Sequence, residues 1–200
     1  MSATLNVVVS INSTTVMQTY WTTPPFFKVL KFFLCYNAHM KKILFVCHGN
    51  ICRSPMAEFV MKFLVKKAGL ENDFLIESKA TSTEEIGNPP HPGTLKKLAQ
   101  QGIPVFPHKA VQMKKSDAEK YDFIIGMDSF NLKNIQRILG SSFNKNIFLL
   151  LDFTLRPGNI ADPWYTGNFD ETFNDIWEGC NCFLQKITNG SLRFDENFTI

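Results

Sequence analysis

From residue 41 onward, the hydrophobic positions of the chain switch between two spacings. Four short runs are almost wholly apolar and rich in β-branched and aromatic residues, as in strands buried on both faces; they span 42–46, 74–78, 121–127 and 146–151. Apolar residues at intervals of three to four predict helices near 54–67, 93–101, 128–139 and 169–188. Ser54 is expected to cap the first helix, with Pro55 at its first position.

This alternation of strands and helices predicts an α/β fold. We expect a four-stranded parallel sheet flanked by helices in three layers, with right-handed crossover connections. Ligands of such sheets bind outside the carboxyl ends of the strands. A functional site is therefore expected in the loop that follows the first strand.

The first 39 residues differ in composition from the rest of the chain. They contain no Asp or Glu, and Lys28 and Lys31 interrupt their apolar part, which is unlike a secretory signal. We expect residues 1–39 to be a poorly ordered extension and residues 40–200 to be the folded domain. The alternative is that 26–34 forms a short amphipathic helix that docks on a membrane or a partner. No apolar run reaches 18 residues, so no stable membrane insertion is expected.

Composition and charge narrow the class of protein. A chain of 200 residues with 44% hydrophobic and 20% charged content is typical of a globular protein with one sizeable core. A net charge of +3 is too small to indicate a nucleic-acid partner. The five cysteines are odd in number and irregularly spaced, which favours a reducing cytoplasm over a disulfide framework. Cys180 and Cys182 have no matching second pair, so they are interpreted as core thiols rather than zinc ligands.

The stretch FVCHGNICRSP, residues 45–55, carries the strongest chemical signal. An anion at the start of the helix that follows would meet unpaired backbone N–H groups and the positive end of the helix dipole. Gly49 is expected to let the loop turn its amides inward, and Asn50 to brace the loop. Arg53 adds a planar fork for two oxygens of one phosphate. The stretch therefore predicts a cradle for a tetrahedral oxyanion.

Cys47 begins this cradle, so its sulfur is expected to lie below a bound phosphorus atom. The surrounding amides and guanidinium favour a thiolate, which is the nucleophilic form of the side chain. The Ser54 hydroxyl is expected to donate a hydrogen bond to that sulfur and make it a better leaving group. A buried apolar cysteine at the end of a strand is the alternative, and Gly49 and Arg53 together argue against it.

These residues resemble the low-molecular-weight protein tyrosine phosphatase family, whose signature is a Cys, five residues and an Arg followed by Ser-Pro. The resemblance runs from Met40 to about residue 190 and includes four further segments, Thr81–Pro90, Gly102–Ala110, Tyr121–Leu132 and Ala161–Gly167. It implies a flavodoxin-like fold, also called the phosphotyrosine phosphatase I fold. It also implies metal-independent hydrolysis of phosphotyrosine without a cofactor, a phosphotyrosine protein as substrate, and a monomer or weak dimer.

The resemblance also implies roles for individual residues. Asp162, in an Asp-Pro pair, is expected to be the general acid that protonates the leaving group and later activates water. Trp164 and Tyr165 match an aromatic wall beside the substrate ring, and Glu58 and His108 match an ion pair behind the phosphate loop. The residues expected to bind phosphate or substrate are, with those two aromatics, His48, Gly49, Asn50, Ile51, Cys52 and Ser54.

Several alternatives stay open on the same scaffold. Arsenate reduction occurs in relatives but needs resolving cysteines, and only Cys52 lies near Cys47. Relatives that cleave phosphoarginine tend to have Thr at the position of Ile51. A catalytically inactive phosphate-binding module is disfavoured because nucleophile, Arg and acid are present together. The family further implies a reversible Cys47–Cys52 disulfide as a redox switch. A protonated His48 is a hypothesis for a preference for more anionic substrates.

Overall fold

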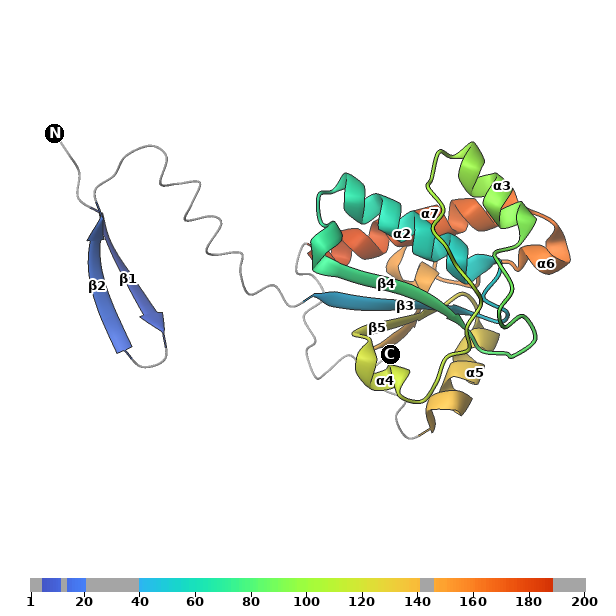
Figure 1. Cartoon of the computed structure of the whole chain (residues 1–200), viewed down its shortest axis with the longest axis horizontal. Helices are drawn as coiled ribbons and strands as arrows, with labels where there is room; N and C mark the ends of the chain where they lie inside the picture. The colour runs from blue at the N-terminus through green and yellow to red at the C-terminus, as the bar shows by residue number, and fades with distance from the viewer. Residues whose placement is uncertain (1–4, 12–13, 21–39, 141–145, 189–200) are drawn as a thin grey trace. The chain divides into compact units, whose positions relative to one another are not determined.

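The computed structural model describes residues 5–11, 14–20, 40–140 and 146–188 of the chain (Figure 1). The chain divides into two compact units, Met1–His39 and Met40–Ile200, which are described separately. In the first unit, β1 (Leu5–Ile11) and β2 (Thr14–Tyr20) pair antiparallel, with Leu5 opposite Tyr20. The sequence analysis did not anticipate these strands. The helix considered for 26–34 lies outside the described residues.

The second unit is built on a four-stranded sheet in the order β4-β3-β5-β6, with every neighbouring pair parallel. The strands are β3 (Lys41–Cys47), β4 (Phe74–Ala80), β5 (Phe123–Gly126) and β6 (Ile147–Leu149). The predicted α/β class and parallel sheet are confirmed. The run expected as strand over 146–151 is shorter, because a 3-10 turn, η3 (Leu150–Phe153), follows β6.

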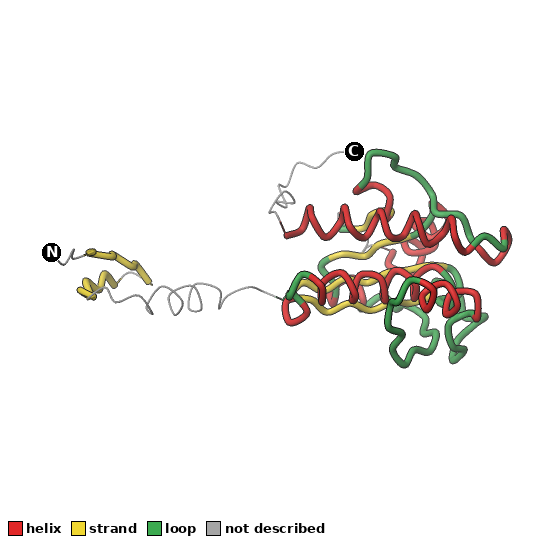
Figure 2. Tube along the Cα trace, turned by 90° about the horizontal axis from the view of Figure 1, so that it is seen from above, coloured by secondary structure: helices red, strands yellow, loops and turns green. Residues whose placement is uncertain are grey.

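Helices cover both faces of the sheet, and Figure 1 shows α2, α3 and α7 on one face and α4 and α5 on the other. Their bounds, with those of the short elements, are α2 (Arg53–Lys67), η1 (Glu71–Asp73), α3 (Pro92–Gln100), α4 (Asp117–Lys120), α5 (Ser129–Leu139), α6 (Pro163–Thr166) and α7 (Phe169–Thr188). The axes of the longest helices lie nearly along those of the strands (Figure 2). The predicted bounds of α7 agree with the structure, and those of α3 and α5 differ by one residue.

The central strand β3 joins the two halves of the core. Ile43 and Phe45 point into the cluster under α2 and α7, whereas Leu44 and Val46 point into the cluster that α5 covers. This alternation follows from the two-residue period of a strand. All four side chains are fully buried, and burial of each contributes about 1.5–3 kcal/mol. The sequence KILFV is therefore apolar throughout because both faces of β3 are covered.

Cys180 and Cys182 occupy α7, as the helical pattern predicted. Cys180 is fully buried, and this burial raises the pKa of its thiol well above the ordinary range. Cys182 is half-buried and packs against the same core cluster. Cys47, Cys52 and these two residues are all free thiols.

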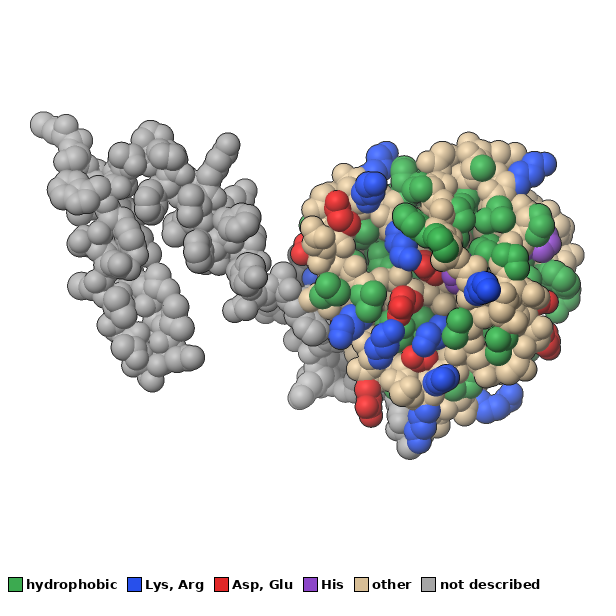
Figure 3. Space-filling model, viewed as in Figure 1, with side chains coloured by type: hydrophobic (Ala, Val, Ile, Leu, Met, Phe, Trp, Pro, Cys, Tyr) green, Lys and Arg blue, Asp and Glu red, His purple; other side chains and the backbone are tan. Residues whose placement is uncertain are grey.

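The surface of the second unit mixes charges of both signs. On the face drawn in Figure 3, Lys and Arg side chains are spread among acidic and apolar side chains. Among the described residues, no helix is both long and apolar enough to cross a membrane.

The close approach of α7 to η3 yields a prediction about Gly179. A Cβ atom at this position would lie 2.6 Å from Cγ and 3.2 Å from the carbonyl oxygen of Leu150, which is fully buried. A glycine-to-alanine change inside a helix ordinarily stabilises it by about 0.5–1 kcal/mol. We expect Gly179→Ala instead to lower the free energy of unfolding by about 1–3 kcal/mol, measured by urea denaturation.

The control for this substitution is Gln185→Ala on the same helix. Gln185 is exposed, so its removal is expected to change the free energy of unfolding by less than about 0.5 kcal/mol. A stability gain in Gly179→Ala would contradict the tight packing of α7 on η3.

Candidate active site

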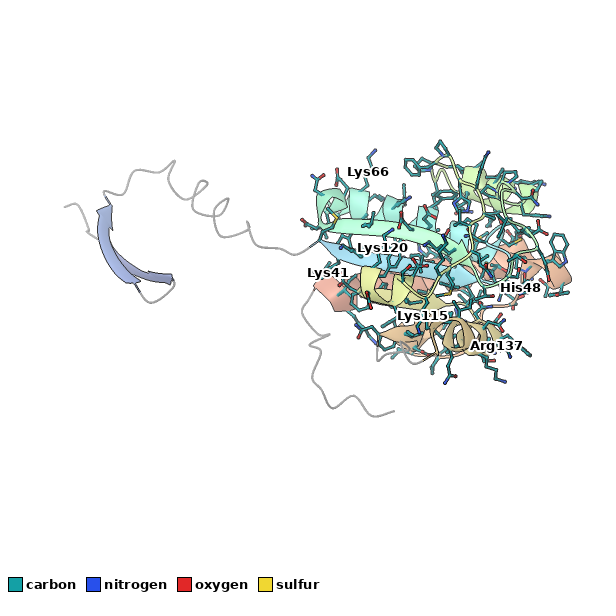
Figure 4. All side chains as sticks on the ribbon, turned by 60° about the horizontal axis from the view of Figure 1, so that its bottom comes forward. Lys41, His48, Lys66, Lys115, Lys120 and Arg137 are labelled. Carbon is teal, nitrogen blue, oxygen red and sulfur yellow. The ribbon has the colours of Figure 1, made fainter. Side chains whose placement is uncertain are left out.

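The candidate site lies at the carboxyl end of β3. Cys47 is the last residue of that strand, and α2 begins six residues later at Arg53. Figure 4 shows His48 at one end of the domain and Lys41 and Lys66 at the other. Since the sheet is parallel, the loops after β4 and β5 reach the same end. The structure thus brings together the loop over 48–52 and segments distant from it in the sequence.

The sulfur of Cys47 is held by donors from its own loop. The Asn50 backbone N–H donates to Sγ over 3.3 Å, and the Ser54 hydroxyl lies 3.1 Å from it. The predicted contact between Ser54 and the sulfur is present. The prediction that Ser54 caps the helix was wrong, because α2 begins at Arg53 with Cys52 in the cap position and without a side-chain cap. The hydroxyl is engaged with the sulfur instead.

Asn50 holds the loop from inside and is fully buried. Its side-chain amide donates to the hydroxyls of Ser54 and Ser78, each over 2.9 Å, and its oxygen accepts from the Val111 backbone N–H. Its φ of 59° lies in the left-handed region, which Asn tolerates better than most residues. The brace expected of Asn50 is therefore observed.

Gly49 serves the loop in a different way from the one predicted. The positive φ that the loop requires falls on Asn50, not on Gly49. A Cβ at Gly49 would lie 3.0 Å from Cγ of Glu85, which packs against the loop from the segment after β4. Gly49 thus makes room for a neighbouring side chain.

Glu58 and His108 meet behind the loop. Nδ1 of His108 lies 3.5 Å from Glu58, and both side chains are buried. The Ser78 hydroxyl donates to the same carboxylate over 2.6 Å, and Nε2 of His108 donates to the Asn50 carbonyl over 3.3 Å. A continuous buried network therefore runs from Glu58 to the sulfur of Cys47. The sequence analysis missed Ser78, because nothing in its strand pattern marks one serine as a bridge.

Arg53 is buried and shared between two carboxylates. Its two terminal nitrogens each lie 2.5 Å from a carboxylate oxygen, one of Asp128 and one of Asp162. The first nitrogen also donates to the Ile160 carbonyl, whereas the buried Nε has no partner among the described residues. Burial alone lowers the pKa of Arg53, but attraction to Cys47 and to the two carboxylates outweighs it and raises that pKa.

Asp128 has two functions in this arrangement. One oxygen accepts from the Asn131 backbone N–H and caps α5. The other oxygen binds Arg53. Asp162 likewise caps the short α6 through the Trp164 N–H and turns its second oxygen to Arg53.

A pocket of about 110 Å³ opens above this arrangement. Cys47 and Arg53 form part of its lining. Trp164 and Tyr165 also line it, and these two residues are 57% and 84% exposed to solvent. The predicted lining residues that the structure brings together here are Cys47, His48, Gly49, Ile51, Cys52, Arg53, Asp162, Trp164 and Tyr165. Glu84 and Glu85 also line the pocket and were missed, because acidic residues in a polar loop carry no distinctive pattern.

Trp164 is supported from behind by His91. The His91 ring stacks on Phe169 with centroids 5.3 Å apart and meets the Trp164 ring edge-on at 5.8 Å. Its Nδ1 accepts from the Gly93 N–H and caps α3, and its backbone N–H donates to the Ile51 carbonyl. His91 therefore connects the phosphate loop to the segment that carries Asp162 and Trp164.

Cys52 lines the same pocket as Cys47 and is buried. Burial, followed by the proximity of Cys47 and Asp162, raises the pKa of the Cys52 thiol to about 12. This side chain is accordingly protonated at neutral pH. The disulfide between Cys47 and Cys52 stays a prediction.

The family model for the low molecular weight phosphotyrosine protein phosphatases matches residues 42–192 of this chain. The chain belongs to this family. The phosphatase is 39% identical over 150 residues to the Bacillus subtilis low molecular weight protein-tyrosine-phosphatase YfkJ. The matched region covers 74% of this chain and 96% of the relative. The crystal structure of YfkJ superposes with a TM-score of 0.74 at 38% identity, covering 76% of this chain and 98% of the other.

Two further solved structures resemble the phosphatase. The low molecular weight protein tyrosine phosphatase SP-PTP from Streptococcus pyogenes is 42% identical, with a TM-score of 0.68 and coverage of 74% of this chain and 93% of the other. The Drosophila arginine phosphatase DARP is 31% identical, with a TM-score of 0.66 and coverage of 77% and 99%. The family resemblance drawn from the sequence and the expected enzyme class, a protein-tyrosine-phosphatase type of hydrolase, are confirmed.

The buried bonds and positive φ of Asn50 yield a prediction about the phosphatase's stability. Asn50→Ala removes the side-chain hydrogen bonds and places a Cβ-bearing residue without local compensation in the left-handed region. We expect a loss of about 3 kcal/mol or more in the free energy of unfolding, measured by urea denaturation.

Asn50→Gly is the matched control for this substitution. It removes the same hydrogen bonds but accepts the positive φ, so we expect it to be about 1 kcal/mol more stable than Asn50→Ala. Equal stabilities of the two variants would contradict a contribution from backbone strain.

Proposed function

We propose that this phosphatase removes phosphate from protein phosphotyrosine and from small aryl phosphates through a phosphocysteine intermediate on Cys47. The observation that carries the proposal is the position of the Cys47 sulfur. It lies in the lining of the pocket, contacts the Ser54 hydroxyl and the Asn50 N–H, and shares the pocket with Arg53. In the proposed mechanism this sulfur acts as a thiolate directly below the bound phosphate.

The first step is capture of the phosphate. The loop amides and the start of α2 attract its charge, and Nε of Arg53, which has no partner within the described part of the chain, supplies a donor. The phosphate oxygens compete with Asp162 for the terminal nitrogen of Arg53 that now holds this carboxylate. Binding thereby frees Asp162 to take up a proton and to face the leaving group.

In the second step the Cys47 thiolate attacks phosphorus. A bond forms between Sγ and phosphorus while the bond from phosphorus to the aryl oxygen breaks. The protonated Asp162 gives its proton to the departing oxygen, so the leaving group departs as a neutral phenol. Arg53 and the loop amides stabilise the charge on the three remaining oxygens during transfer.

In the third step water releases the phosphate. Asp162, now a carboxylate, takes a proton from a water molecule whose oxygen attacks phosphorus. The bond between phosphorus and Sγ breaks, and the sulfur leaves as a thiolate. The Ser54 hydroxyl, 3.1 Å from the sulfur, stabilises that thiolate by a hydrogen bond.

The aromatic residues of the pocket favour an aryl leaving group. Trp164 and Tyr165 provide flat apolar surfaces beside the phosphate site, which suit the ring of phosphotyrosine. Ile51 stands where phosphoarginine-cleaving relatives tend to have Thr, and its apolar side chain in the lining supports the tyrosine type. The arsenate reductase alternative is not favoured, because Cys180 is buried in α7 and engaged with the core.

The thiolate mechanism is tested with para-nitrophenyl phosphate at mildly acidic pH in the presence of a chelator. We expect the wild type to keep its activity and Cys47→Ser to lose it by about 10³-fold or more, because serine is a much poorer nucleophile under these conditions. Activity that Cys47→Ser retains, or that the chelator removes, would overturn the mechanism.

The acid function of Asp162 is tested by varying the leaving group. We expect Asp162→Asn to reduce kcat/KM for phenyl phosphate by about 10²–10⁴-fold and that for para-nitrophenyl phosphate much less. The more basic phenolate depends on a proton donor, whereas nitrophenolate leaves readily without one. Asp73→Asn makes the same change just before β4, at the opposite end of that strand from the site, and is the control. Equal losses for both substrates would exclude Asp162 as the acid.

A further inference from the structure

The mouth of the pocket has two chemically different sides. Trp164 and Tyr165, the aromatic side, come from α6, and Glu84 and Glu85, the acidic side, come from the loop after β4. Neither glutamate has a function in the steps above. They line the same pocket as Cys47 and Arg53, so a substrate that places its phosphate over Cys47 comes within reach of both sides.

Glu84 is oriented by His48. Nε2 of His48 lies 3.0 Å from a carboxylate oxygen of Glu84, and the side chains are 47% and 70% exposed. This pair joins the residue next to the nucleophile to the rim. The carboxylate is fixed beside the pocket and still reaches solvent, where a ligand can approach its second oxygen.

Glu85 is anchored separately. Its side chain packs over Gly49, so that a Cβ on residue 49 would lie 3.0 Å from Cγ of Glu85. Its carboxylate accepts a hydrogen bond of 2.7 Å from the Asn88 side-chain amide. This amide is neutral, and no ion pair joins Glu85 to a cationic side chain within the described part of the chain. The acidic side therefore keeps a net negative charge even when His48 is protonated.

The interior of the pocket determines which part of a substrate meets this rim. Arg53 is about 97% buried, lines the pocket, and has an Nε without a partner among the described residues, so it fixes the phosphate at the bottom. The tyrosine ring of a phosphopeptide then extends outward along the aromatic side. The peptide chain and the residues flanking phosphotyrosine consequently lie at the mouth.

Both sides of the mouth favour a cation there. Glu84 and Glu85 attract a positive side chain by charge, and the exposed faces of Trp164 and Tyr165 attract it through their π-electrons. Arg53 is the single Lys or Arg in the pocket lining among the described residues, and it lies at the bottom. An acidic flanking residue would meet only repulsion.

We propose that Glu84, oriented by His48 and assisted by Glu85, selects phosphotyrosine peptides that carry a Lys or Arg next to the phosphotyrosine. This inference rests on the proposed action on protein phosphotyrosine and specifies its substrate class. It also changes the expected effect of His48. A positive charge on His48 would be neutralised by the carboxylate of Glu84, with which His48 is paired. Protonation of His48 alone therefore does not create a preference for anionic peptides.

The test uses three phosphopeptides that differ only in whether Lys, Ala or Glu flanks the phosphotyrosine. Phosphate release gives kcat/KM for each with the full chain. At about 10 mM salt we expect the Lys peptide to exceed the Glu peptide by about 10-fold, because attraction replaces repulsion at short range. At about 0.5 M salt the ratio should approach one, since both rim carboxylates are open to screening.

Substitutions of Glu84 test whether this residue causes the preference for the Lys peptide. Glu84→Gln is expected to lower the ratio of Lys to Glu peptide to about 3 or less, and Glu84→Lys to bring it below one. Glu71→Gln removes an equal charge from an exposed position in η1, before the start of β4, and should leave the ratio unchanged. Using ratios within one variant removes any change in its overall activity.

The outcomes separate this inference from the proposed function. Equal rates for the three peptides in the wild type would overturn the basic preference and leave hydrolysis of phosphotyrosine standing. A preference that persists in the double variant Glu84→Gln, Glu85→Gln would overturn its assignment to these residues. Failure to hydrolyse any of the three peptides would overturn the proposed function, and this inference with it.

Discussion

The site depends on one buried side chain, that of Asn50. A loop that offers its amides to an anion cannot satisfy them internally, so something else must hold its shape. Asn50 does this with hydrogen bonds to Ser54, Ser78 and Val111 while its own backbone adopts a positive φ. Through Ser54 the same network reaches the Cys47 sulfur. The same hydrogen bonds therefore determine both the shape of the loop and the surroundings of the Cys47 sulfur.

Electrostatic balance is the second constraint on the phosphatase. Arg53 is almost fully buried, and a buried guanidinium without anionic partners would be very costly. Asp128 and Asp162 supply those partners. In the proposed mechanism a phosphate replaces Asp162 as a partner of Arg53, so the guanidinium keeps an anionic partner throughout. Because Asp162 caps a short surface helix, we infer that its release from Arg53 disturbs the core less than release of Asp128 would.

The floor and the mouth of the pocket are built from different kinds of structure. The floor combines a strand end, a helix start and buried hydrogen bonds, and in the proposed mechanism it binds the phosphate group that all monoesters share. The mouth is formed by loop residues that are largely exposed, including the His48–Glu84 pair. Family relatives named for tyrosine and for arginine phosphatase activity share the fold. We infer that differences in substrate preference between members of the family arise mainly from the residues at the mouth of the pocket.

The sequence by itself determined the α/β class, the parallel sheet, and the cradle from Cys47 to Ser54, because these depend on local periodicity and on residues adjacent in the chain. The family resemblance added Asp162, Trp164, Glu58 and His108. Their positions in the sequence alone give no sign that they lie near Cys47 in the fold. Only the tertiary structure showed the bridge through Ser78, the second partner of Arg53 in Asp128, and the acidic side of the mouth. These contacts join residues 20 to 75 positions apart. Their physical reason is that parallel strands deliver loops distant in sequence to one edge of the sheet, where side chains that carry no local pattern become neighbours.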